Sequence, residues 1–133
     1  SNGAALKILS ERIQQTIARA AQSSRHEQMA QSAILSEKLQ QLGEATQTLL
    51  GCADISARLA NATAYLEAFG HIVLAWIWLE QALACGESDG DFHAAKRNAC
   101  KFFFTYELPR VEPQLALLKT LDRTTLDTPD NWL

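Results

Sequence analysis

Apolar residues recur along this chain at steps of three and four, which is the spacing of amphipathic helices. The pattern predicts a first helix over about residues 4–22 and a second that ends near Gly51, which tolerates the positive φ common just after a helix. The start of the second helix has two candidates. Ser24 and Glu27 have the spacing of a capping box, whereas Ser32 offers a later N-cap.

The third predicted helix is the most apolar segment of the chain. It begins after Asp54 or Ser56, which are both favourable N-caps, and continues to Leu83. No full charge occurs between Glu67 and Glu80, so this helix is apolar almost all round. A helix of this kind is expected at the centre of a bundle or beneath a partner.

A fourth helix is predicted to begin near Phe92 and to be interrupted by a proline. Pro109 lacks a backbone donor and clashes with the preceding turn, which predicts a kink at this point. Pro113 suits the first turn of a restarted helix, and the apolar stripe then continues to about Thr120. The tail beyond it carries Thr, Asp, Asn and Pro and is expected to be extended.

These elements together predict an all-α fold. No segment has the alternation of a strand, and four helices with short connections favour an up-down-up-down four-helix bundle. The bundle is expected to have a proline kink in its last helix and an extended C-terminal tail. The predicted organisation is a tag remnant and linker over residues 1–3, the bundle domain over 4–121, and the tail over 122–133.

Composition and charge narrow the class of protein. Of the 133 residues, 47% are apolar and 20% are charged, which is typical of a soluble globular domain. The net charge of −3, with scattered basic residues, argues against nucleic-acid binding, which needs clustered Lys and Arg. The longest uncharged run, Ala68 to Leu79, is too short to span a bilayer. Three widely spaced cysteines without a CxxC pair indicate reduced thiols in a cytoplasmic protein.

The motifs predict no catalytic, cofactor-binding or metal-binding site. A di-iron bundle would need Glu residues three positions before its histidines, and His26, His71 and His93 lack them. The pair Glu67 and His71 is too small a set to hold a metal, and His71 is interpreted as bonded to Glu67 or to a carbonyl. The sequence has neither the phosphate-binding glycine loops nor the G-x-S-x-G nucleophile motif.

The aromatic residues of the last two helices are the remaining candidates for function. Trp76 and Trp78 are two positions apart, so they lie on nearly opposite faces and one is expected to point outward or into an interface. The strip from Ile72 to Leu79 has no polar residue that water could solvate. Because monomers rarely expose large contiguous apolar patches, this strip favours a homodimer. Plain core packing is the first interpretation of the aromatic cluster, followed by a subunit or domain interface and then by an acyl-binding pocket. The candidate interface or packing residues are Tyr65, Phe69, Gly70, Trp76, Trp78, Phe102, Phe103, Tyr106 and Pro109.

Three groups of residues have a specific order and spacing. They are Leu59-Ala60-Asn61-Ala62-Thr63-Ala64-Tyr65-Leu66 with Phe69-Gly70 and Trp76; Ala95-Lys96 with Phe102-Phe103-Phe104 and Leu108-Pro109; and Leu121-Asp122-Arg123 with Leu126-Asp127. In this order they resemble the C-terminal helical extension of a subfamily of bacterial flavin-dependent acyl-CoA dehydrogenases, similar to 3-methylmercaptopropionyl-CoA dehydrogenase. The resemblance extends over about residues 35–128.

The resemblance implies a non-catalytic C-terminal accessory domain that supports the stability or assembly of its parent enzyme. In that family the flavin site and the catalytic glutamate belong to preceding domains, so the resemblance implies no catalytic residue and no cofactor in this chain. The implied parent is an oxidoreductase of fatty acid metabolism that uses FAD to oxidise an acyl-CoA to its enoyl-CoA. Its catalytic domains are the implied partners. The alternatives are a helical bundle that binds an acyl chain and an independent protein-interaction module.

Overall fold

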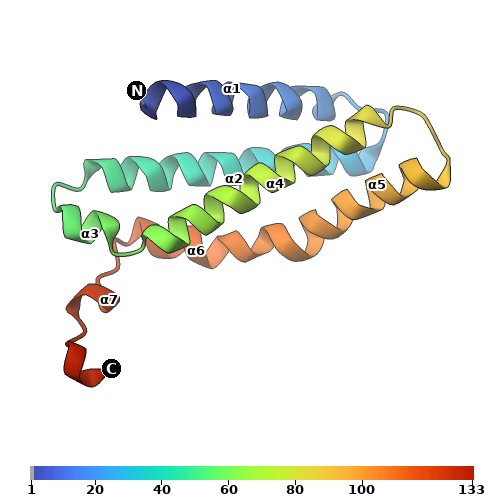
Figure 1. Cartoon of the computed structure of the whole chain (residues 1–133). Coiled ribbons are helices and arrows are strands. Elements are labelled where there is room, and N and C mark those ends of the chain that lie inside the picture. Colours follow the sequence, from blue (N-terminus) through green and yellow to red (C-terminus); the bar gives the residue numbers. More distant parts are fainter. Residues whose placement is uncertain (1) are drawn as a thin grey trace.

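A computed structural model describes residues 2–133, and within this range the chain forms helices and no strand (Figure 1). The predicted all-α class is confirmed. The elements are α1 (Asn2–Ala21), α2 (His26–Gly51), α3 (Ile55–Leu59), α4 (Ala62–Ala84), α5 (Asp91–Phe102), the π-helical turn η1 (Phe103–Glu107), the 3-10 turn η2 (Leu108–Arg110), α6 (Val111–Lys119), α7 (Thr124–Asp127) and the 3-10 turn η3 (Asp130–Trp132).

The first predicted segment, residues 1–3, is only partly described. Residue 1 lies outside the described residues, whereas Asn2 and Gly3 belong to α1. The assignment of residues 1–3 to a tag remnant and linker stays a prediction. The helical pattern starts earlier than the apolar stripe because a helix needs no apolar residue in its first turn.

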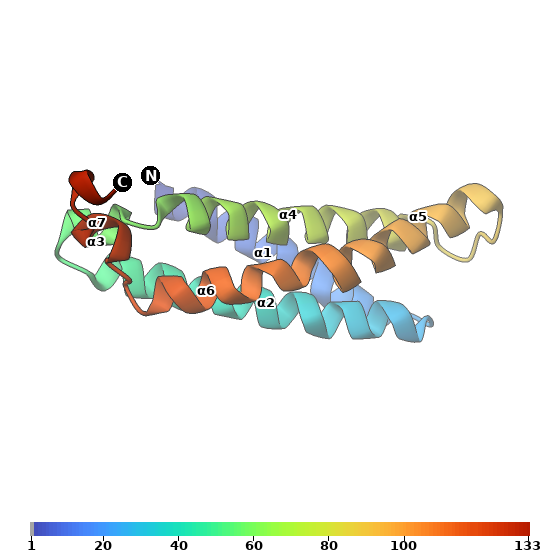
Figure 2. The same cartoon turned by 90° about the horizontal axis from the view of Figure 1, so that it is seen from below.

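The long helices lie side by side and alternate in direction along the chain (Figures 1 and 2). Helix α2 contacts α1, α4 and α6, and α4 contacts α1, α2, α5 and α6. In Figure 1, α4 crosses in front of α2, with α1 above it and α5 and α6 below it. Lys38 of α2 is buried and forms an ion pair with Glu112, which ties α2 to α6.

The core is built around a face of α4 that is rich in alanine. Ala68, Ile72, Ala75, Leu79 and Ala82 follow one another on this face, and none is more than 1% exposed. Small side chains let neighbouring backbones approach closely, so the larger aliphatic residues of α1, α2 and α6 can fill the space above them. We refer to these five residues as the alanine face.

The opposite side of α4 is uncovered within this chain, so of the two predicted positions, the centre of a bundle or beneath a partner, the helix is not enclosed by its own bundle. Leu74 is 46% exposed and Ile77 is 40% exposed. By length and composition alone, α4 is also long and apolar enough to cross a membrane. Its alanine face packs against four other helices, however, which identifies α4 as a core helix of this domain.

The predicted third helix is divided in two, so the prediction of one continuous helix is wrong. Asp54 caps α3, and its Oδ1 accepts hydrogen bonds from the backbone N–H groups of Ser56 at 3.0 Å and Ala57 at 3.4 Å. The chain then leaves the helical conformation at Asn61, which has φ −123° and ψ 34°. The Asn61 side chain donates a hydrogen bond to the carbonyl of Asp122 at 2.9 Å, so the break is fixed by a contact with the tail.

Helix α2 begins at His26, near the earlier of the two predicted positions, but the predicted capping box does not form. Ser24 instead donates a hydrogen bond to Glu87 at 3.1 Å, in the loop after α4. The Ser23 hydroxyl accepts from the backbone N–H of Arg25 at 3.1 Å. The residue that hydrogen-bonds to the backbone at the start of α2 is therefore Ser23 and not Ser24.

The helical path changes its winding just before Pro109. The N–H of Leu108 donates to the carbonyl of Phe103, five residues earlier, which makes the preceding turn π-helical. A 3-10 turn then contains Pro109, and α6 restarts with Pro113 in its first turn. Because proline donates no hydrogen bond and crowds the preceding turn, a wider turn before it leaves room for the ring.

The tail is not extended, because it contains α7 and η3. The Arg123 guanidinium donates to Asp54 at 3.1 Å and to Asp127 at 3.3 Å, so the tail is fixed to the start of α3. The hydrogen bond from Ala57 N–H and then the one from Arg123 lower the pKa of Asp54. The stability that these contacts provide is present above the usual Asp range and is lost as the pH falls through the lowered pKa.

The alanine face predicts the effect of a larger side chain. We expect Ala75→Leu to lower the free energy of unfolding by about 1–3 kcal/mol, because extra methylene groups in a packed core force neighbours apart. Chemical denaturation followed by circular dichroism measures the change. The control is Ala84→Leu at the exposed end of the same helix, which should leave stability nearly unchanged. Equal stability of both variants would show that α4 is not closely packed at this face.

Candidate functional site

The structure does not bring the candidate residues together at one place. Tyr65 and Phe69 line a cavity between α1, α2 and α4, and Trp76 packs against α1. Trp78, Phe102 and Phe103 line a shallow groove between α4 and α5, with Tyr106 beside them. Gly70 and Pro109 belong to neither the cavity nor the groove.

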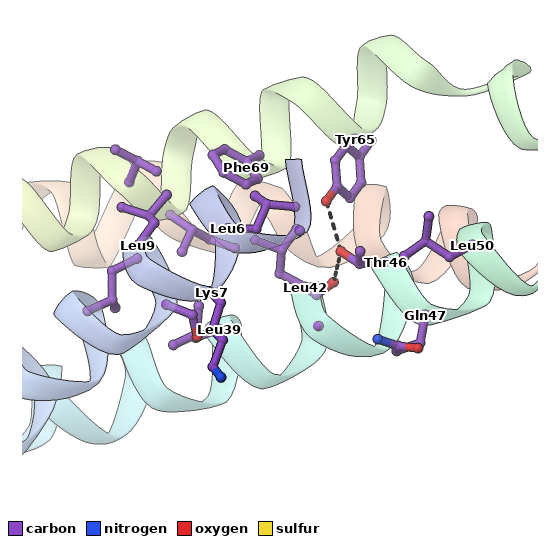
Figure 3. A pocket seen from close by; sticks show the side chains of 16 residues that line it. Leu6, Lys7, Leu9, Leu39, Leu42, Thr46, Gln47, Leu50, Tyr65 and Phe69 are labelled. Atoms are coloured by element: carbon purple, nitrogen blue, oxygen red, sulfur yellow. Dashed lines mark hydrogen bonds between the residues drawn. The ribbon is translucent and has the colours of Figure 1, made fainter. Parts of the chain in front are cut away.

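The cavity has a volume of about 340 Å³ and is walled by the first half of α1, the second half of α2 and the first half of α4 (Figure 3). Tyr65 and Thr46 are joined through their hydroxyl oxygens at 2.8 Å, and Thr46 donates to the carbonyl of Leu42 at 2.8 Å. Thr46 has a single hydroxyl proton, so Tyr65 is the donor in the first bond. Sequence reasoning missed this cavity, because its walls come from leucine stripes that also signal core packing.

Trp76 is half-buried on the α1 side of α4. Its Nε1 donates to the Thr16 hydroxyl at 2.7 Å, and Thr16 in turn donates to the Glu80 carboxylate at 2.5 Å. Glu80 also pairs with Arg19 at 3.2 Å. This chain of hydrogen bonds satisfies the indole N–H and fixes the position of α4 against α1, so Trp76 has a structural role.

Trp78 lies on the other flank of α4, against α5. The two tryptophans therefore occupy different sides of the helix, as their spacing predicts. Both tryptophans are half-buried, so neither is fully exposed, and the expectation that one of them meets an interface stays a prediction. The outward positions are instead occupied by aliphatic residues of α4.

An apolar surface extends from α4 across the groove to α5 and η1. Leu74 and Ile77 are three positions apart, and Leu74 and Trp78 are four apart, so these residues are neighbours on the surface of α4. Across the groove, Phe102 is 55% exposed and Tyr106 is 64% exposed. Their ring centroids are 4.9 Å apart. We define the α4–α5 apolar face as Leu74, Ile77, Trp78, Phe102 and Tyr106.

The π-helical turn arranges the aromatic residues of this region. Phe103 is 9% exposed and Phe104 is 5% exposed, whereas the neighbouring Phe102 and Tyr106 project outward. His71 of α4 lies over this turn, with its ring centroid 6.1 Å from that of Phe103. The Nδ1 of His71 is 3.0 Å from the backbone carbonyl of Glu67, which agrees with the carbonyl-bonded interpretation. The turn was not foreseen, because a π-helix has no clear sequence signal.

Gly70 and Pro109 do not contribute to the apolar face. A Cβ atom at Gly70 would meet no other atom within 4 Å, so no helix of this chain approaches it closely. Pro109 is exposed in the 3-10 turn. Both residues act on the backbone, Gly70 by lowering helix propensity and Pro109 by changing the winding.

The three cysteines lie at separate places in the fold, beside α2 and α4 and within α5. Within residues 2–133 no group of three or more His, Cys, Asp and Glu side chains is placed to hold a metal ion. The cysteines are free thiols. Burial, and then the nearby Glu27 carboxylate, raise the pKa of Cys100 to about 12, so its thiol stays protonated at neutral pH.

A comparison with protein families gives a match over most of the chain. A family model described as acetyl-CoA dehydrogenase C-terminal like matches residues 9–129, which contain every helix from α2 to α7. No curated protein matches the chain.

The cysteine environments predict an order of reactivity. At pH 8 we expect a thiol-specific disulfide reagent to modify Cys52, which is half-buried, before Cys85 and Cys100, which are 7% and 0% exposed. The reason is that only an accessible thiolate attacks the reagent. Mass spectrometry of the native protein identifies the modified thiols, and a sample unfolded in guanidinium gives the total. Modification of native Cys100 as fast as Cys52 would contradict its burial.

Proposed function

Because this chain belongs to the acetyl-CoA dehydrogenase C-terminal-like family, we propose that it is the non-catalytic C-terminal accessory domain of a flavin-dependent acyl-CoA dehydrogenase. The family match over residues 9–129 is the observation that carries this proposal. In this proposal the catalytic residues and the FAD belong to the other domains of the parent enzyme. The role of this domain is to stabilise or assemble the parent.

The proposed role depends on how the helices are arranged. We describe α1, α2, α4 and the continuous path α5–η1–η2–α6 as an up-down-up-down four-helix bundle, with a kink at Pro109 in the last helix. The alternating directions and the mutual contacts of these helices support this description. In such a bundle, one side of α4 and the exposed aromatic residues next to it are available to a partner.

The α4–α5 apolar face is the proposed partner-binding surface. Each Å² of apolar area removed from water contributes about 25 cal/mol, and monomers seldom expose large contiguous apolar patches. Leu74, Phe102 and Tyr106 are each more than 40% exposed, which supports a role for this face in contacts outside the chain. We propose that a second copy covers it, so that the parent enzyme assembles as a homodimer with this face inside the interface.

Sedimentation velocity tests the proposed dimer. We expect the unmodified chain to sediment as a dimer at high concentration. The double variant Leu74→Glu, Ile77→Glu should sediment as a monomer, because two carboxylates would be buried without partners in the interface. The matched control is Met29→Glu on α2, which is 42% exposed and does not belong to the α4–α5 apolar face. A monomer at every concentration, or a dimer unchanged by the double variant, would contradict the proposal.

Flavin binding gives a second test. We expect the purified chain to be colourless, to retain no FAD through gel filtration, and to reduce no electron acceptor in the presence of acyl-CoA. The physical reason is that the chain lacks a recognisable phosphate-binding loop and a candidate base for removing the substrate proton. Absorbance at the flavin wavelengths after gel filtration measures retention. A yellow protein with bound flavin would place the cofactor site in this domain and overturn its accessory role.

A further inference from the structure

The cavity between α1, α2 and α4 has the properties of a small-molecule site. Binding pockets for small ligands have volumes of about 300–1,000 Å³ and are mostly apolar, with a few polar groups that orient the ligand. This cavity, at about 340 Å³, lies at the small end of that range. Its lining includes the buried Leu42 and Ile72 and the half-buried Phe69.

Two hydroxyl groups of the wall, those of Tyr65 and Thr46, are already paired with each other, and Ser10, Lys7 and Gln47 are the other polar residues that line the cavity. Tyr65 donates to Thr46, and Thr46 donates to the carbonyl of Leu42. Neither hydroxyl has a proton left for a ligand. An occupant of the interior therefore gains mainly from apolar contact, as an alkyl chain does.

The edge of the cavity carries one positive charge. Lys7 is the only charged residue among those that line it, and no acidic residue is among them. Figure 3 shows Lys7 and Gln47 on the side of the cavity away from Phe69 and Tyr65. The whole chain has a net charge of −3, so its overall field does not favour anions. Attraction of an anion to this cavity therefore depends on Lys7.

A glycine in the middle of α2 leaves room in this cavity. Gly43 lines it, and a Cβ atom built at Gly43 would meet no other atom within 4 Å. Glycine in a helix interior costs about 1 kcal/mol relative to alanine. No crowding within the chain requires glycine at this position, and the missing side chain widens the cavity.

From these observations we propose that the cavity binds a small amphipathic anion of the class of a medium-chain fatty carboxylate. The alkyl tail occupies the space between the aliphatic residues of α1, α2 and α4. The carboxylate lies at the edge near Lys7 and accepts a hydrogen bond from the Gln47 side chain of α2. This site is separate from the α4–α5 apolar face and does not depend on the proposed dimer.

Isothermal titration calorimetry with sodium dodecanoate, below its micelle concentration, tests the proposal. We expect saturable binding of one dodecanoate per chain. Butanoate, which lacks the tail, should bind too weakly to detect. Dodecyltrimethylammonium, which has the tail and the opposite charge, should bind at least several-fold more weakly than dodecanoate.

Two variants locate the site. Gly43→Leu places a side chain into the cavity and should weaken dodecanoate binding by about tenfold or more. Its control is Gly51→Leu at the end of the same helix, where a Cβ atom also meets nothing within 4 Å and which does not line the cavity. Lys7→Gln should weaken dodecanoate binding by about two- to fivefold, the effect of one exposed ion pair, and leave dodecyltrimethylammonium binding no weaker.

The outcomes separate the proposal from its rivals. Thermal unfolding checks that Gly43→Leu is folded, and we expect it to be at least as stable as the unmodified chain because leucine favours a helix more than glycine does. If Gly43→Leu is unfolded, Gly43→Ala takes its place and should weaken binding by a smaller factor. No binding of dodecanoate, equal binding by the Gly43→Leu and Gly51→Leu variants, or equal binding of the anionic and cationic amphiphiles would each overturn the proposed site.

Discussion

The close packing of the alanine face of α4 against its neighbours is the contact on which the rest of the structure depends. Because Ala68, Ala75 and Ala82 are small, the helices around α4 approach its backbone, and the intervening Ile72 and Leu79 fill the space that remains. Such packing leaves little room for large side chains on that face. Apart from Ile72 and Leu79, the bulky residues of α4 are consequently located on its flanks and on its outer side, where they form the surfaces available for binding.

The helical segments of this fold could be predicted because burial repeats with the period of the helix. The loop after Ala84 follows from local residue preferences, because Gly86 has the positive φ that often ends a helix. Helix α2 also ends at Gly51, but Gly51 lies within the helix without a positive φ, so the predicted reason for this end is wrong. The break at Asn61 could not be predicted in the same way, since its cause is a hydrogen bond to Asp122 at the other end of the chain. The residues next to Asn61 in the sequence give no sign that its partner is Asp122, because the two are brought together only by the fold.

The candidate site was only partly accessible to sequence reasoning, for a related physical reason. Residue type identified the aromatic side chains, and the spacing of Trp76 and Trp78 correctly placed them on different flanks of α4. Residue type alone does not show whether the indole N–H of a tryptophan is hydrogen-bonded within the chain, as that of Trp76 is, or exposed to solvent. Nor could it distinguish Leu42 in a cavity wall from a leucine in the core, because both belong to the same apolar stripe. A mid-helix glycine such as Gly43 was the one local signal of unfilled space.

The cavity and the α4–α5 apolar face share α4 but use different parts of it. Phe69 and Val73 line the cavity in the first half of the helix, whereas Ile77 and Trp78 belong to the outer face in the second half. A ligand in the cavity can alter partner binding only if it interacts differently with two arrangements of α4. The alanine face resists such a shift, because moving α4 would open voids against four other helices. The geometry therefore favours two surfaces that bind independently, with α4 acting as a rigid wall between them.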